Sequence, residues 1–97
     1  MPEIDFKNLK GTPFQKKVWT ELLKIKKGTV ITYKDLARTV GKSRAIRAVA
    51  NAVGANPMII KIPCHRVVRS DGTLGGYSGK GGTKTKKALL LKEGVKL

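Results

Sequence analysis

The chain has 97 residues, 40% of them hydrophobic, so it can build one modest core and is too short for two. It carries 21 Lys and Arg against 6 Asp and Glu, a formal charge of +15, which favours a polyanionic partner, nucleic acid first. It lacks the ~20 consecutive apolar residues of a membrane helix and a signal-peptide core, so we expect an intracellular protein, cytoplasmic or nuclear. One Cys and one His form neither an internal disulfide nor, by themselves, a structural zinc site, and we expect no metal and no cofactor.

The beginning of the chain predicts an arm followed by a capped helix. Residues 1–11 carry little pattern and are assigned to an N-terminal arm, and residues 12–97 to a single domain. Thr12 is the predicted N-cap, with proline at the first helical position and Gln15 closing a capping box. Apolar residues then recur at helical spacing, and we expect this helix to end at Gly28.

Two further helices are predicted next, with a short turn between them. A capping signature at Thr32 precedes an expected helix over 33–40. A tight turn at 41–42 follows, and Ser43 is the predicted N-cap of a third helix over 44–53. Helix, brief Gly-containing turn and helix are typical of a helix-turn-helix.

The centre of the chain is strongly basic. Residues 36–70 include no acidic residue and seven Lys and Arg. This span is therefore predicted to face phosphates. The residues assigned to DNA contacts are Lys42, Ser43, Arg44, Arg47 and Arg66.

The second half of the chain predicts a small sheet and a last helix. Asn56-Pro57 ends the helical region, and apolar extended segments over 58–60 and 63–68 indicate a small sheet or hairpin. The glycine-rich loop at 75–82 lacks the Gly-Lys-Ser/Thr ending of a phosphate-binding loop, so nucleotide binding there is rejected. The last helix is expected to begin at Thr85 and to end at Gly94. The residues expected to dock it on the core are Ala88, Leu89 and Leu91.

The only cysteine and the only histidine, Cys64 and His65, are adjacent. A thiol reacts as the thiolate, and a neighbouring imidazole can take its proton. In an extended segment the two side chains point to opposite faces, so we expect a relay through water. The alternative is a cysteine that only packs in the core.

Three segments together carry a resemblance to a known family. They are Asn56-Pro57, Ile62-Pro63-Cys64-His65-Arg66-Val67-Val68 and Gly75-Gly76-Tyr77-Ser78-Gly79. They resemble the active-site region of the O(6)-alkylguanine-DNA alkyltransferases, also called methylated-DNA–protein-cysteine methyltransferases. The resemblance implies an α+β, mostly helical, winged-helix-like domain with the helix-turn-helix and a small sheet or hairpin at the active site. It also implies a monomer.

The implied function is DNA repair by a single-turnover S-methyltransferase. A methyl or alkyl group would pass from O(6)-alkylguanine in double-stranded DNA to Cys64, and the resulting thioether would inactivate the protein. The alkylated base would have to be flipped out of the duplex to reach the thiol.

The resemblance also implies roles for particular residues. The catalytic set consists of Cys64 as acceptor, His65 as its base through water, Glu93 as the carboxylate that orients the imidazole, Asn56 as the side chain that ties the active-site turn, and Tyr33 as donor to the departing guanine. The substrate-binding set consists of Tyr33, Ile59, Tyr77 and Ser78. Arg47 would enter the duplex in place of the flipped nucleotide. Ile59 and the longer loop over 77–86 depart from the usual pattern and put tolerance of bulky alkyl groups in doubt.

Two rival functions remain open from the sequence. One is a non-enzymatic alkyltransferase-like protein that binds the lesion; such proteins typically replace the cysteine, which Cys64 argues against. The other is a winged-helix-like transcription regulator with an incidental cysteine. That alternative leaves the cluster Pro63-Cys64-His65-Arg66 unexplained.

Overall fold

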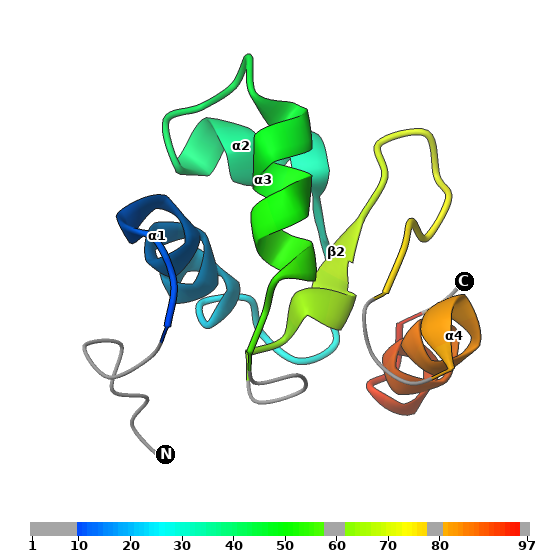
Figure 1. The fold of residues 1–97 in the computed structure, drawn as a ribbon. Helices are drawn as coiled ribbons and strands as arrows, with labels where there is room; N and C mark the ends of the chain where they lie inside the picture. The colour runs from blue at the N-terminus through cyan, green and yellow to red at the C-terminus, as the bar shows by residue number, and fades with distance from the viewer. Residues whose placement is uncertain (1–9, 58–61, 78–80, 96–97) are drawn as a thin grey trace.

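The computed structural model describes residues 10–57, 62–77 and 81–95 (Figure 1). Its elements, in chain order, are α1 (Pro13–Leu22), β1 (Ile31–Thr32), α2 (Tyr33–Thr39), α3 (Ile46–Gly54), the 3-10 turn η1 (Cys64–Arg66), β2 (Val67–Val68) and α4 (Gly82–Lys92). The predicted class, α+β and mostly helical with a small sheet, is confirmed. Of the predicted N-terminal arm, only Lys10 and Gly11 lie within the described residues.

The start of α1 is the predicted capping box. The Thr12 hydroxyl accepts a hydrogen bond from the Gln15 N–H at 3.1 Å, and the Gln15 side-chain oxygen accepts one from the Thr12 N–H at 2.9 Å. Each interaction satisfies a backbone N–H that the first turn of a helix leaves without a partner.

The predicted end of α1 at Gly28 is wrong, because the helix ends at Leu22. After the C-cap Leu23, the N–H groups of Lys24 and Ile25 bond to carbonyls three residues back, at 3.1 Å each, which tightens the chain into turns. Gly28 lies in a later turn with φ of +87°, a conformation that glycine adopts without strain. The apolar spacing beyond Leu22 therefore belongs to a turn segment that still packs on the core.

The helix-turn-helix prediction is confirmed, but the position of its second cap is wrong. Thr32 caps α2 as expected, its hydroxyl accepting from the Asp35 N–H at 3.0 Å. The second helix, α3, begins at Ile46 with Ala45 as N-cap and no side-chain cap. The Ala45 N–H bonds to the Lys42 carbonyl at 2.8 Å, closing a turn that contains Ser43 and delays the helix by two residues.

The core lies between α1, α2 and α3, and Figure 1 shows α3 in the middle of the molecule. The Trp19 indole N–H donates to the carbonyl of Ala52 at 2.9 Å, joining α1 to α3. The small Ala52 side chain lets the indole approach this closely. The buried residues of the cluster are Val18, Trp19, Leu22, Leu36, Ala37, Val40, Val49, Ala52, Val53, Ile62, Cys64 and Val67.

The two strands form a parallel sheet in which Ile31 pairs with Val67 and Thr32 with Val68. Parallel neighbours need a crossover, and here α2 and α3 supply it. The predicted extended conformation of Cys64 and His65 is wrong. The Arg66 N–H bonds to the Pro63 carbonyl at 3.1 Å, and this curls Cys64–Arg66 into η1.

The last helix, α4, begins at Gly82, three residues before the predicted start at Thr85. It docks through Lys86 and Leu90, which are four residues apart and therefore lie on one face. The predicted docking through Ala88 and Leu91 is wrong: Ala88 is exposed, and Leu91 is 51% exposed. The other predicted residue, Leu89, is half-buried. The helix ends at Lys92 with Glu93 as its C-cap, and the predicted stop, Gly94, follows directly with φ of +89°.

Candidate active site and DNA interface

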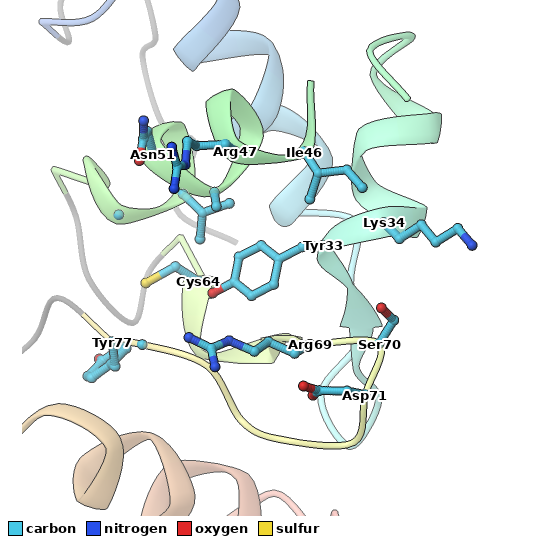
Figure 2. A pocket seen from close by; sticks show the side chains of 14 residues that line it. Tyr33, Lys34, Ile46, Arg47, Asn51, Cys64, Arg69, Ser70, Asp71 and Tyr77 are labelled. Carbon is cyan, nitrogen blue, oxygen red and sulfur yellow. The ribbon is translucent and has the colours of Figure 1, made fainter. Parts of the chain in front are cut away.

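A pocket of about 660 Å³ opens between α2, α3, η1 and the loop after β2 (Figure 2). Pockets of this size are typical of small-molecule sites. Cys64 lines the wall of this pocket and is 3% exposed. The other lining residues used below are Tyr33, Lys34, Ile46, Arg47, Arg69 and Tyr77. Three predicted site residues from separate parts of the sequence, Tyr33, Arg47 and Tyr77, therefore line the same pocket as the thiol.

Asn56 holds the turn that carries the thiol. Its side-chain amide, buried after the end of α3, donates to the carbonyl of Ile62 at 2.6 Å. The Cys64 N–H donates to the same carbonyl at 2.8 Å. Two donors on one oxygen fix the chain direction just before η1, as proposed for Asn56 from the sequence.

The surroundings of the Cys64 thiol keep it protonated, so a base is needed to form the thiolate. Burial raises its pKa, because desolvation disfavours the thiolate. A hydrogen bond with the Asn56 side chain and the positive charge of Lys86 act in the opposite direction. The pKa remains above its ordinary value, so proton removal is a required part of any nucleophilic chemistry here.

The His65 ring is 1% exposed and is oriented by Glu93. Its Nε2 lies 3.0 Å from Glu93 Oε2. The pKa of Glu93 is lowered to about 2, first by its hydrogen bonds with Arg66, so the carboxylate is ionised and can only accept. Nε2 must therefore carry the hydrogen. In that tautomer Nδ1, which has no hydrogen-bond partner among the described residues, carries the lone pair that can accept a proton.

The assignment of Arg66 to DNA is not supported by its surroundings. Its Nε and Nη2 donate to the two Glu93 oxygens at 2.9 and 2.7 Å, and its Nη1 donates to the Ile25 carbonyl at 2.8 Å. The side chain is only 14% exposed. Three of its five N–H donors are engaged in this way, which favours a role for Arg66 in positioning Glu93 over a phosphate contact.

Lys86 is a site residue that the sequence analysis missed. Its side chain is fully buried, Nζ donates to the Gly76 carbonyl at 3.1 Å, and it lies 5.7 Å from the centre of the Tyr33 ring. Burial lowers its pKa to about 8, while the nearby Cys64 acts to raise it. The available signal was its position on the same helical face as Leu90 and Glu93, four and seven residues further on.

The residues predicted to contact DNA lie around the start of α3. Arg47 is exposed in the first turn of α3 and lines the pocket mouth, and Figure 2 shows it across the pocket from Arg69. Lys42, Ser43 and Arg44 are exposed in the turn before α3. Two further predicted pocket residues, Ile59 and Ser78, lie outside the described residues.

A family model described as "6-O-methylguanine DNA methyltransferase, DNA binding domain" matches residues 13–95. The chain belongs to this family. The match includes each helix and strand named above, from Pro13 to Lys92, and every pocket residue named above.

Three relatives illustrate the similarity. A probable methylated-DNA–protein-cysteine methyltransferase of Acanthamoeba polyphaga mimivirus is 56% identical over 69 residues, 71% of this chain and 46% of that protein. Mycobacterium tuberculosis OGT in complex with DNA is 45% identical with a TM-score of 0.83, over 89% of this chain and 52% of that one. S. pombe Atl1, in complex with damaged DNA containing O6-carboxymethylguanine, is 32% identical with a TM-score of 0.76, over 91% of this chain and 82% of that one. The chain spans about a quarter to a half of the curated relatives it matches.

The described residues also bear on a membrane span and on a metal site. None of their helices is long and apolar enough to cross a membrane. They also contain no group of three or more His, Cys, Asp or Glu side chains placed to hold a metal ion.

Proposed function

We propose that this chain transfers a methyl or alkyl group from O(6)-alkylguanine in double-stranded DNA to Cys64, once per molecule. The observation that carries the proposal is the placement of the Cys64 thiol on the wall of the pocket, next in sequence to His65, which the ionised Glu93 carboxylate orients. Family membership and the solved complexes of relatives with DNA support it. A protein with this function works where the DNA is, in the cytoplasm or nucleus.

In the proposed reaction, the alkylated base leaves the duplex and enters the pocket. His65 Nδ1 takes the Cys64 proton through a water molecule, and Glu93 stabilises the imidazolium that forms. Lys86 stabilises the thiolate. The sulfur then forms a bond to the alkyl carbon as the bond from that carbon to O(6) breaks, and the electron pair stays on the oxygen. The carbon–sulfur bond is a thioether, which explains a single turnover.

Tyr33 is suited to donate to the departing guanine. Burial is the first cause that raises its pKa, so the phenol keeps its proton at neutral pH. Its ring lies beside Lys86 Nζ, and Figure 2 shows its hydroxyl on the Cys64 side of the pocket. We assign Tyr77, and Ser78 next to it, to holding the base.

The alternative is a lesion-binding protein without transfer, and similarity to S. pombe Atl1 keeps it as a second candidate. The retained Cys64 favours transfer. The deciding experiment is to incubate the protein with a duplex containing O(6)-methylguanine and to measure its intact mass. We expect a gain of one methyl group, located on the Cys64 peptide. Unmodified protein that still binds the lesion duplex would establish the alternative.

Arg47 and Lys42 provide a test of the extrusion step. If Arg47 fills the space of the flipped nucleotide, we expect Arg47→Ala to slow transfer from saturating duplex by about tenfold to a hundredfold, because flipping costs a few kcal/mol. Transfer from free O(6)-methylguanine should change little, since the free base needs no extrusion. Lys42→Ala removes an exposed phosphate contact and should weaken binding without slowing transfer from bound duplex. Equal rates for the two variants on saturating duplex would show that Arg47 is only another phosphate contact.

A further inference from the structure

The backbone that precedes Tyr77 is attached to α4 at two consecutive carbonyls. Lys86 Nζ donates to the Gly76 carbonyl at 3.1 Å, and the Thr83 hydroxyl donates to the Gly75 carbonyl at 3.5 Å. Thr83 and Lys86 are three residues apart, so both side chains lie on one face of the helix. Figure 1 shows α4 next to the loop that follows β2. Because Tyr77 lines the pocket, these contacts fix the course of the chain as it reaches the pocket wall.

Lys86 also connects this loop to Tyr33. Its Nζ lies 5.7 Å from the centre of the Tyr33 ring, within the range of a cation–π interaction. The same ring packs on the loop, since a Cβ on Gly75 would lie 3.1 Å from it. Tyr33, Gly76 and Tyr77 line the pocket, whereas Lys86 is not among the described residues that do so. Lys86 is therefore placed to position the residues that would touch a base, and not to touch the base itself.

Burial of the Lys86 charge costs stability. The side chain is fully buried, and the ion pairs found among the described residues do not include it. Burial is the largest effect on its pKa and lowers it to about 8, while Cys64 acts to raise it and Arg69 to lower it further. Tyr33 stays neutral in this range, because its own pKa is raised. A methionine would fill a similar volume without burial of a charge, so the fold alone does not account for a lysine here.

We propose that Lys86 is a positioning residue for base recognition: through the Gly76 carbonyl, its ammonium group holds Tyr77 in place against the extruded guanine. This inference rests on the proposed function in taking the pocket as the site of that base. It is separate from stabilisation of the thiolate, because the contact with Gly76 does not involve Cys64. A charged amine donates a stronger hydrogen bond than a neutral one, so loss of the Lys86 proton should loosen the loop.

The test measures binding by a Cys64→Ser protein, which forms no thiolate and does not consume the lesion. The measured quantity is the lesion preference, the ratio of the Kd for an undamaged duplex to the Kd for the same duplex with O(6)-methylguanine. We expect Lys86→Met to lower the lesion preference about tenfold, as for loss of one hydrogen bond from a charged donor. The free energy of unfolding should stay the same or rise, because a buried charge is removed. Lys87→Met and Lys34→Met are the matched controls: each removes an exposed positive charge and should weaken binding of both duplexes alike.

The pH profile of the lesion preference provides a second readout. The serine variant lacks the thiolate that acts to raise the Lys86 pKa, so Lys86 should lose its proton by about pH 9. We expect the lesion preference of the Cys64→Ser protein to fall between about pH 6.5 and pH 9, and that of Lys86→Met on the same background to stay constant. A lysine that only fills space would give the two proteins the same profile.

The outcomes separate this inference from the proposed function. A lower lesion preference in Lys86→Met alone, with a constant pH profile and no loss of unfolding free energy, supports the inference. An unchanged preference, an equal fall in the two controls, or the same pH profile in Lys86→Met and its parent would overturn it. A fall that accompanies a large loss of unfolding free energy would also overturn it, because Lys86 would then be a core residue. Methyl transfer by the protein with Cys64 intact is a separate measurement: its absence would overturn the proposed function, while the lesion preference still decides the role of Lys86.

Discussion

We expect Cys64→Ser to lower alkyl transfer by at least about a thousandfold while lesion binding is retained. The hydroxyl keeps the shape of the side chain and its hydrogen bond with Asn56, but it does not ionise near neutral pH as a thiol can. The positive charge of Lys86, which favours the thiolate, has no anion to stabilise in the variant. The measurement is the intact mass after incubation with O(6)-methylguanine duplex, beside an equilibrium titration of the same duplex.

The control for Cys64→Ser is a measurement of its free energy of unfolding. Cys64 is buried in the core cluster, so a loss of transfer has meaning only if the variant remains folded. We expect a change in free energy of unfolding of about 1 kcal/mol, because one buried atom is replaced by a slightly smaller polar one. A serine variant that still gains a methyl group would show that Cys64 is not the acceptor.

Features decided by neighbours in sequence could be predicted. The capping box at Thr12 and Gln15 and the cap at Thr32 each need partners only three residues away. The end of α4 shortly before Gly94 needs only a following residue that tolerates positive φ. Such signals act within one turn of helix, so they can be recognised in the sequence without knowledge of the fold.

Two other features of the fold could not be predicted from the sequence. Ser43 is an ordinary N-cap residue, but the bond from Ala45 to Lys42 claims its position for a turn. The β-branched neighbours of Cys64 favour a strand, whereas the Asn56 amide, brought in after α3, fixes the Ile62 carbonyl and the turn forms instead. The first error comes from a local turn that competes with the helix cap, and the second from the Asn56 contact, which overrides local strand propensity.

The site shows the same division. The family resemblance assigned Tyr33, Arg47, Cys64 and Tyr77 to one site, and the structure places all four around one pocket. Basic residues were harder to sort, because composition alone does not separate a solvated Lys or Arg from a buried one. Arg66 was assigned to DNA from the sequence, whereas its guanidinium donates to Glu93, and Lys86, which was given no role from the sequence, is buried beside Tyr33.

The ion pair between Arg66 and Glu93 supports the second large prediction. Glu93→Gln keeps the shape of the side chain but leaves the half-buried guanidinium without its counter-charge. The amide also has only one oxygen for the three donor contacts that Glu93 now accepts, two from Arg66 and one from His65. We expect the free energy of unfolding at pH 7 to fall by about 2 to 4 kcal/mol, measured by urea denaturation. Glu21→Gln is the matched control: its pair with Lys24 is at the surface, and a loss of at most about 0.5 kcal/mol is expected.

The contribution of Glu93 to the free energy of unfolding should fall as the pH falls. Folding lowers the Glu93 pKa from 4.5 to about 2, so the folded state favours the carboxylate. The stabilisation is fully present above the unfolded pKa, from about pH 5.5 upward, and is lost as the pH falls toward 2. The unchanged protein should therefore lose stability across this range more steeply than Glu93→Gln, and the two denaturation curves should converge at low pH. A constant difference between them from pH 7 to pH 3 would contradict the ion pair as the source.

The same variant separates orientation of His65 from simple loss of structure. Without urea, and at a pH where both proteins are fully folded, we expect Glu93→Gln to transfer the methyl group about tenfold to a hundredfold more slowly. The reason is that the imidazole loses the carboxylate that holds its tautomer and stabilises its charge. The deficit should shrink as the pH rises toward the Cys64 pKa, since hydroxide in the solvent then removes the thiol proton without help from His65. A purely structural defect would lower the rate by the same factor at every pH. A pH-independent deficit would therefore leave Glu93 as a stabilising partner of Arg66 and remove it from the chemistry.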